Sequence, residues 1–230
     1  QSVPCEMTGE VRVYDKKGTF EETGKWVQLA YVQDNSGVTT LYVDGELKAQ
    51  GDQGVKIGDL LAVDGTTLTI GMAKFWNDTA LDAKIDNIRI YDYALTTEQI
   101  MDPVLPVELP LEMYYTFDDV DGATVPDQSG NGNNATLLNG ASVRNDDKMG
   151  GNVLALDNEG VNGGDAKGLA LPNDAFKNME DVTLVMDTYL SDSKTWTGLL
   201  AAGANQSNYM ILANQGVKST TYGLTNATMF

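Results

Sequence analysis

One segment, residues 68–100, constrains the fold of this chain more than any other. It holds two runs typical of β-strands, separated by a loop that carries Phe75 and Trp76. Side chains in the second run alternate between two faces, with Asp86, Ile88 and Ile90 on one and Asn87, Arg89 and Tyr91 on the other. Thr96 and Gln99 then have the spacing of a capping box. The segment therefore predicts a strand with one largely apolar face, followed at once by a short helical turn.

Strand-like runs recur along the rest of the chain and predict an all-β protein. The run from Trp26 to Val32 is apolar on much of both faces, as in a central strand of a sandwich, so we expect Trp26 in the core. A hairpin follows, in which Asp44 and Gly45 form a two-residue turn that accepts positive φ. Further runs lie at 113–117, 153–156, 168–171, 181–189, 196–202 and 209–212.

Composition excludes several functional classes. The 230 residues include 33 acidic and 15 basic side chains, which gives a formal net charge of -18. Such a surface repels nucleic acid and anionic lipid, so we expect neither as a partner, and no run approaches the roughly 20 apolar residues needed for membrane insertion. Histidine is absent, which removes Ser-His-Asp and Cys-His catalysis and His-ligated zinc. The acidity is compatible with an extracellular protein and with divalent cations.

Several motifs resemble those of laminin-G-like, concanavalin A-like β-sandwich domains. The closing strand and helical turn of that family are similar to IDNIRIYDYALTTEQI at 85–100, and its central strands to WVQLAY at 26–31 and LYVDGEL at 41–47. Its opening strand and turn are similar to YYTFDD at 114–119 and DQSGNGN at 127–133. The resemblance implies an antiparallel β-sandwich of the jelly-roll type.

The family motifs occur in an unusual order. A closing-type half at 1–103 comes first, a proline-rich linker at 104–110 follows, and an opening-type half at 111–230 ends the chain. Half a sandwich would expose one inner face and several strand edges, so we expect the two halves to form one sandwich. Exchange of halves between chains, which would give self-association, is the alternative. The order fits either a circular permutant or a window across two tandem domains.

Oxygen-bearing residues in two of these motifs suggest a structural calcium site. Asp86 shares its expected strand face with Ile88 and Ile90, where an ionised carboxylate is costly unless it is paired or bound to a cation. The resemblance implies that the closing strand and the opening turn are neighbours, which would gather oxygens from Asp86, Asp118, Asp127, Asn131 and Asn133. Such hard ligands suit Ca²⁺. The alternative is that Asp127 and the asparagines cap a turn, and that Asp86 bonds to backbone amides.

Four aromatic residues are candidates for contact with a sugar: Trp76, Phe75, Tyr209 and Trp196. A ring on an exposed loop offers a flat apolar surface to the C–H face of a pyranose, and Trp76 is the strongest candidate. The alternative is that these rings pack in the core, as most tryptophans in a sandwich of this size do.

The resemblance implies a non-catalytic extracellular module for carbohydrate binding or adhesion, secreted or at the cell surface, as part of a larger bacterial surface or glycan-degrading protein. A second hypothesis is a structural repeat whose half-domains complement neighbouring chains. A glycanase is a third, because the same sandwich hosts such enzymes. The E-x-D-x-x-E pattern of sandwich glucanases is absent from the chain.

Overall fold

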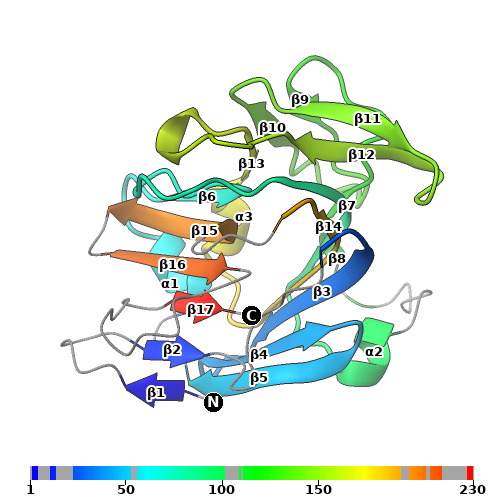
Figure 1. Cartoon of the computed structure of the whole chain (residues 1–230). Coiled ribbons are helices and arrows are strands. Elements are labelled where there is room, and N and C mark those ends of the chain that lie inside the picture. The colour runs from blue at the N-terminus through cyan, green and yellow to red at the C-terminus, as the bar shows by residue number, and fades with distance from the viewer. Residues whose placement is uncertain are drawn as a thin grey trace.

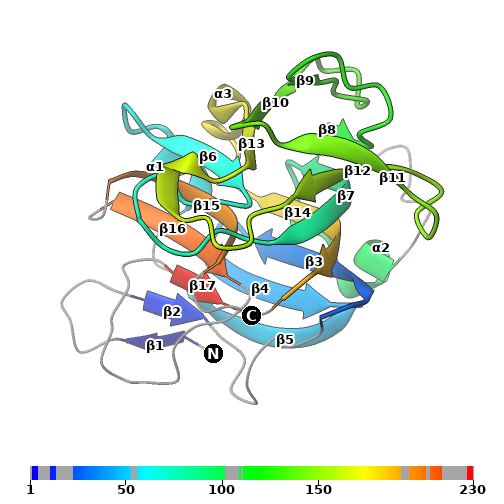
Figure 2. The same ribbon diagram turned by 45° about the horizontal axis from the view of Figure 1, so that its top comes forward.

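The computed structural model describes residues 2–4, 11–13, 23–52, 56–101, 109, 111–192, 197–205, 208–213 and 227–229. Within these ranges the chain forms two β-sheets that pack as a sandwich, accompanied by short helices, as Figure 1 and the tilted view in Figure 2 show. The prediction of an all-β sandwich is therefore confirmed. None of the described helices combines the length and the apolar character needed to cross a membrane.

Sheet A has nine strands in the order β1-β2-β17-β16-β15-β6-β13-β10-β9. Neighbouring strands are antiparallel, except that β17 runs parallel to both β16 and β2. The bounds of its strands are β1 Ser2–Pro4, β2 Val11–Val13, β6 Thr67–Ile70, β9 Thr124–Val125, β10 Ala135–Leu138, β13 Gly168–Leu171, β15 Gly198–Asn205, β16 Asn208–Ala213 and β17 Ala227–Met229.

Sheet B follows the order β11-β12-β7-β14-β3-β4-β5, and β8 pairs with the part of β7 that β12 leaves free. Its strands are β3 Trp26–Gln33, β4 Val38–Val43, β5 Glu46–Asp52, β7 Ala83–Tyr91, β8 Leu111–Tyr115, β11 Ser142–Asp146, β12 Gly151–Leu156 and β14 Val182–Leu190. The helices are α1 Ile57–Leu61, α2 Thr97–Met101, α3 Asn173–Phe176 and a 3-10 helix, Gly163–Asp165.

Strands from before and after the proline-rich segment alternate in both sheets. In sheet A, β6 lies between β15 and β13, and in sheet B, β14 lies between β7 and β3. One cluster of buried side chains fills the space between the sheets and draws on both parts of the chain, for example Leu29 and Ile88 from the first and Leu154 and Leu212 from the second. The division at 1–103, 104–110 and 111–230 stays an interpretation of the family motifs, and most of the linker lies outside the described residues.

Two local predictions are confirmed. Asp44 and Gly45 join β4 to β5 with φ of 49° and 72°, the positive values that a tight two-residue hairpin turn requires. At the start of α2, the backbone N–H of Thr96 donates to Oε1 of Gln99 at 2.8 Å, and the N–H of Gln99 donates to Oγ1 of Thr96 at 3.3 Å. These reciprocal bonds are a capping box.

The predicted face of Asp86 is wrong. Asn87 has φ of 49°, and the pairing of β7 with β14 shifts there by one residue, which is the signature of a β-bulge. Ile85 and Ile88 therefore both point into the core, whereas Asp86 lies directly opposite Asp187 on the outer face. Strict alternation along the strand could not anticipate this extra residue.

Candidate functional site

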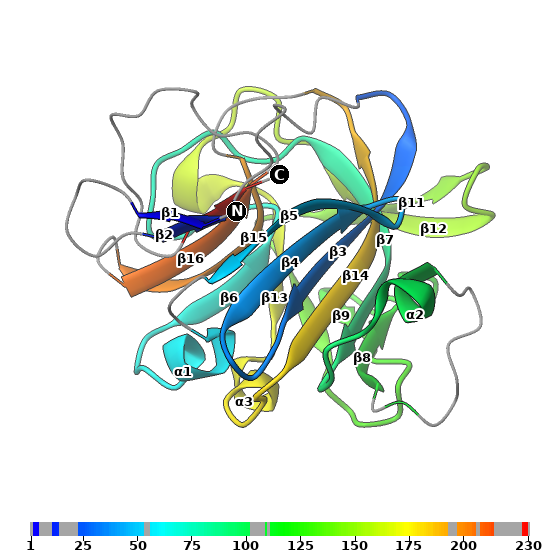
Figure 3. The same ribbon diagram turned by 90° about the horizontal axis from the view of Figure 1, so that it is seen from below.

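The outer face of sheet B, which points away from sheet A, carries side chains in rows that cross the strands. Directly opposed residues of antiparallel strands project to the same side, so each row is defined by the register of β3, β14 and β7. Apolar side chains at one end of this face are covered by Leu95 and Ile100, from the segment that ends in α2: Ala30, Val32, Val185 and Tyr91. Figure 3 shows α2 beside β8 on this side of the sheet.

Two neighbouring rows on the same face contain partly exposed side chains. The first, here called the aromatic row, consists of Trp26, Tyr189 and Lys84. The rings of Trp26 and Tyr189 have centroids 5.9 Å apart and an interplanar angle of 58°. The second, here called the polar row, consists of Gln28, Asp187 and Asp86. Aromatic and hydrogen-bonding groups are thus fixed side by side on a rigid sheet.

The aromatic row forms the floor of a hollow of about 360 Å³, with residues 145–148 at the tip of the β11–β12 hairpin as its wall. The Nζ atom of Lys84 lies 5.0 Å from the Tyr189 ring centroid and 2.6 Å from Oδ2 of Asp146. Nζ of Lys148 lies 6.0 Å from the same ring centroid. The Lys84 ammonium lowers the pKa of Asp146, so this carboxylate stays ionised. The hollow therefore combines flat apolar rings with fixed charged groups, which suits a pyranose with its apolar C–H face and polar rim.

Trp26 was expected in the core, and that prediction is wrong. Along β3 the side chains of Val27, Leu29 and Tyr31 are buried between the sheets, whereas Trp26 and Gln28 share the opposite, outer face. The sequence could have indicated this outward position, because residues two apart on a strand lie on the same face and Trp26 is two residues before the polar Gln28. The high hydrophobicity of the whole run obscured this alternation.

The polar row brings two carboxyl groups together. Oδ2 of Asp187 accepts a hydrogen bond of 2.9 Å from the Asn87 amide, and Oδ1 of that amide accepts one of 3.3 Å from the Tyr114 hydroxyl. Oδ1 of Asp86 accepts a 2.7 Å bond from the backbone N–H of Asn87. Burial raises the pKa of Asp86 to about 7, and the neighbouring Asp187 carboxylate adds to this shift. Burial also raises the pKa of Asp187.

Three of the five predicted calcium ligands lie instead in a closed hydrogen-bond network at the start of β8. The Asp127 carboxylate accepts four bonds of 2.8–3.0 Å, from the backbone N–H groups of Tyr114, Ser129 and Asn133 and from the Ser129 hydroxyl. The side-chain amides of Asn131 and Asn133 donate to the carbonyl of Glu112 at 3.2 Å. These are the turn-capping roles that formed the alternative to calcium.

The other two predicted ligands lie elsewhere. Asp118 follows β8, and its Oδ1 accepts a 2.8 Å bond from the backbone N–H of Asn152. Its charge contributes to the raised pKa of Asp86, so these two carboxyl groups influence each other. In the part of the chain that the structure describes, no group of three or more acidic or cysteine side chains is arranged to hold a metal ion.

Three of the four predicted sugar-contacting aromatics form one cluster on the outer face of sheet A. Ring centroids of Phe75 and Trp76 lie 5.3 and 5.8 Å from that of Tyr209, which is only 1 % exposed. The rings pack with Ala201 and Ile211 against the sheet. Phe75 and Trp76 thus pack over sheet A and remain partly exposed. Trp196, the fourth candidate, lies outside the described residues.

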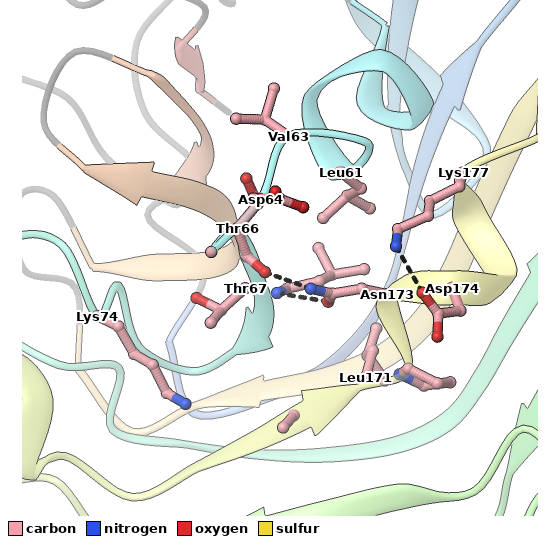
Figure 4. A pocket seen from close by; sticks show the side chains of 14 residues that line it. Leu61, Val63, Asp64, Thr66, Thr67, Lys74, Leu171, Asn173, Asp174 and Lys177 are labelled. Atoms are coloured by element: carbon pink, nitrogen blue, oxygen red, sulfur yellow. Dashed lines mark hydrogen bonds and ion pairs between the residues drawn. The ribbon is translucent and has the colours of Figure 1, made fainter.

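A second hollow, of about 470 Å³, lies where α1 leads into β6 and β13 leads into α3 (Figure 4). Asn173 ties the two connections together, since its Oδ1 accepts a 3.0 Å bond from the N–H of Leu68 and its amide donates to the Thr66 carbonyl. Lys177 forms an ion pair of 2.6 Å with Asp174 at the rim. The lining contains no aromatic ring, so this hollow lacks a surface on which a sugar could stack.

The comparisons with known proteins agree with this architecture. The family model Laminin_G_3, described as Concanavalin A-like lectin/glucanases superfamily, matches residues 6–101. No curated protein matches the chain, and neither does any solved structure. Over residues 6–101 the chain is therefore similar to the concanavalin A-like lectin and glucanase superfamily, and its described residues form a two-sheet sandwich of the same fold class.

Proposed function

We propose that this protein is a non-catalytic carbohydrate-binding module and that it holds its ligand in the hollow over the aromatic row. The observation that carries the proposal is the placement of Trp26 and Tyr189, two partly exposed rings on a rigid sheet, beside the ionic groups of Lys84 and Asp146. A pyranose stacked on these rings would present its hydroxyl groups to those charged side chains. The match to a lectin-like superfamily supports the same ligand class.

The carboxyl pair of the polar row favours binding over hydrolysis. A retaining glycanase needs two carboxyl groups that both reach the scissile bond. Asp86 is only 5 % exposed and accepts the N–H of Asn87, and Asp187 is held by the Asn87 amide. Burial thus withdraws Asp86 from the surface, which leaves Asp187 as the one partly exposed carboxyl group of this row.

We place the protein outside the cell, secreted or at the cell surface, as one module of a larger adhesive or glycan-degrading protein. The net charge of -18 and the resemblance to modules of extracellular bacterial proteins support this location. The module would attach its parent protein to a polysaccharide. Calcium in a structural role would have to rest on Asp86 and Asp118, since the other predicted ligands cap a turn.

Binding to an array of plant, host and microbial polysaccharides tests the proposal, with Tyr189→Ala as the diagnostic variant. Tyr93→Ala is the matched control, because Tyr93 is 41 % exposed on a different segment. Trp76→Ala, measured in parallel, probes the cluster on sheet A. Thermal unfolding of each variant establishes that the fold is retained.

Loss of binding in Tyr189→Ala, with binding intact in the two other variants, is the expected result. Loss in Trp76→Ala alone would move the site to sheet A and refute the aromatic row. An array on which the unaltered protein binds nothing would refute the carbohydrate function itself.

A further inference from the structure

We infer that the binding face continues from the aromatic row onto the polar row, so that the ligand is an uncharged oligosaccharide of at least two units lying lengthwise along β14. This inference rests on the proposed function and adds the direction, minimum length and charge class of the ligand.

The register of sheet B sets the direction. Tyr189 and Asp187 are two residues apart on β14 and project to the same side, as do Trp26 and Gln28 on β3. The two rows are therefore separated by about 7 Å along the strands. A sugar ring stacked over Tyr189 would have its bonded neighbour over Gln28 and Asp187, both partly exposed.

Other parts of the chain bound the exposed area on the outer face of sheet B at both ends. Beyond the polar row, the outer face is covered by Leu95 and Ile100, which pack on Ala30 and Val185. On the hollow's side, the tip of the β11–β12 hairpin forms a wall. The surface between these two boundaries includes both rows, so it has room for two adjoining sugar units.

The polar row is built to give hydrogen bonds with fixed geometry. Asp187 is oriented by the Asn87 amide, which is itself bonded to the Tyr114 hydroxyl. The side-chain amide of Gln28 can both donate and accept, and the backbone N–H of this residue is anchored by a 2.8 Å bond to Asp44. Sugar hydroxyl groups both donate and accept, so they match such a row.

Charge excludes acidic glycans from the same place. Asp187 belongs to the row, and the Asp44 carboxylate at its end is close enough to act on Asp187. Arg89, in the next row, is the cation whose charge opposes that of Asp187. A uronate or sulfate group over this row would meet the negative charges of Asp187 and Asp44, whereas a neutral sugar would meet none of this repulsion.

The test compares ligand lengths. Calorimetric titrations use the one-, two- and four-unit sugars of cellulose, mannan, xylan and galactan, together with tetragalacturonic acid as the acidic probe. The variants are Gln28→Ala and Asp187→Asn, and the matched control is Gln50→Ala. Gln50 is an exposed glutamine on the same face of sheet B, on the edge strand β5 and distant from both rows.

We expect at least one neutral four-unit sugar to bind about tenfold or more tightly than its single unit, with no binding of tetragalacturonic acid. Gln28→Ala should reduce this length advantage about fivefold to tenfold, as the loss of one or two hydrogen bonds implies, and Gln50→Ala should preserve it. Asp187→Asn removes a charge and keeps the hydrogen bonds. This variant should therefore bind tetragalacturonic acid more tightly than the unaltered protein does.

Two results would overturn the inference while leaving the proposed function standing. The first is that a single sugar unit binds as tightly as its four-unit form. The second is that Gln28→Ala leaves the higher affinity for the longer sugar unchanged. Tight binding of tetragalacturonic acid to the unaltered protein would overturn the charge class. If none of these neutral series and no array polysaccharide binds, the proposed function falls, and the inference falls with it.

Discussion

Asp86 and Asp187 face each other across β7 and β14 as directly opposed partners on the outer face of sheet B. Like charges in such a position destabilise a sheet. Burial, the Asp187 carboxylate and the charges of Asp118 and Asp146 all disfavour ionisation of Asp86, against the single stabilising bond from the Asn87 N–H. In the folded protein Asp86 therefore retains a proton at pH values at which the unfolded chain would release it.

This retained proton predicts that stability falls as the pH rises. Asp86 ionises with a pKa of about 7 in the folded protein, compared with an ordinary value of 3.8. Between these values the folded state binds more protons than the unfolded state, so the free energy of unfolding decreases with pH and the loss is complete above pH 7. Asp86→Asn should flatten this slope and raise the stability at pH 8 by an amount on the order of a few kcal/mol.

Urea unfolding of both proteins at several pH values between 4 and 8 measures the effect. Asp119→Asn, a change of the same kind at an exposed residue, is the control and should leave the slope as it is. An Asp86→Asn protein with the same dependence on pH as the unaltered protein would show that Asp86 is ionised throughout this range. The direction of the effect distinguishes it from a salt bridge, whose stability would be lost on acidification.

The bulge at Asn87 shows how far the sequence could predict this site. Alternation identified the strand correctly, and the spacing of Thr96 and Gln99 identified the capping box, because these features depend on neighbours in the chain. The face of Asp86 depends on one residue with positive φ, and its cause is the long-range pairing with β14. Asp86 was therefore correctly singled out as a costly carboxylate, but for the wrong face of the sheet.

The aromatic row illustrates the same limit for the candidate site. Each of its residues lies on a strand that the sequence indicated, yet Trp26, Tyr189 and Lys84 come from three separate segments. Only the order β3, β14, β7 brings them together, and that order is set by packing of the whole sandwich. Phe75 and Trp76, by contrast, adjoin each other in the sequence, which made them the more visible candidates.

Asp127 is predicted to act as a structural cap and not as a cation ligand. Its four hydrogen bonds come from Ser129 and Asn133 in the turn and from the N–H of Tyr114 on β8, so its oxygens are fully used. Asp127→Ala should lower the free energy of unfolding by about 2–3 kcal/mol, since several N–H groups lose a charged acceptor. In urea unfolding, this loss should be the same in calcium and in chelator, and a loss confined to calcium-containing buffer would restore the calcium prediction.

The aromatic cluster on sheet A is predicted to need the space that Gly203, which has no side chain, leaves free. A Cβ atom at this residue would lie 2.6 Å from Cε1 of Phe75 and 2.7 Å from Cβ of Tyr209. Gly203→Ala should therefore displace the Phe75 ring and destabilise the protein by about 1–3 kcal/mol, as overpacking does. Gly164→Ala is the control, because the space around that glycine is open. Equal midpoints of thermal unfolding for the two variants would show that Phe75 does not depend on this close approach.

The interleaved strands predict that neither part of the chain folds alone. Removal of 111–230 would leave β7 without β14 and β12, and removal of 1–103 would leave β14 without both of its neighbours. Each part would expose buried residues of the common core, such as Ile88 in one and Leu154 in the other. Separately produced fragments 1–103 and 111–230 should therefore lack the circular dichroism and cooperative unfolding of the sandwich, and should regain both when mixed. A cooperative transition in either fragment by itself would show that it is a domain, and an intact chain that sediments at twice its own mass would favour exchange of halves between chains.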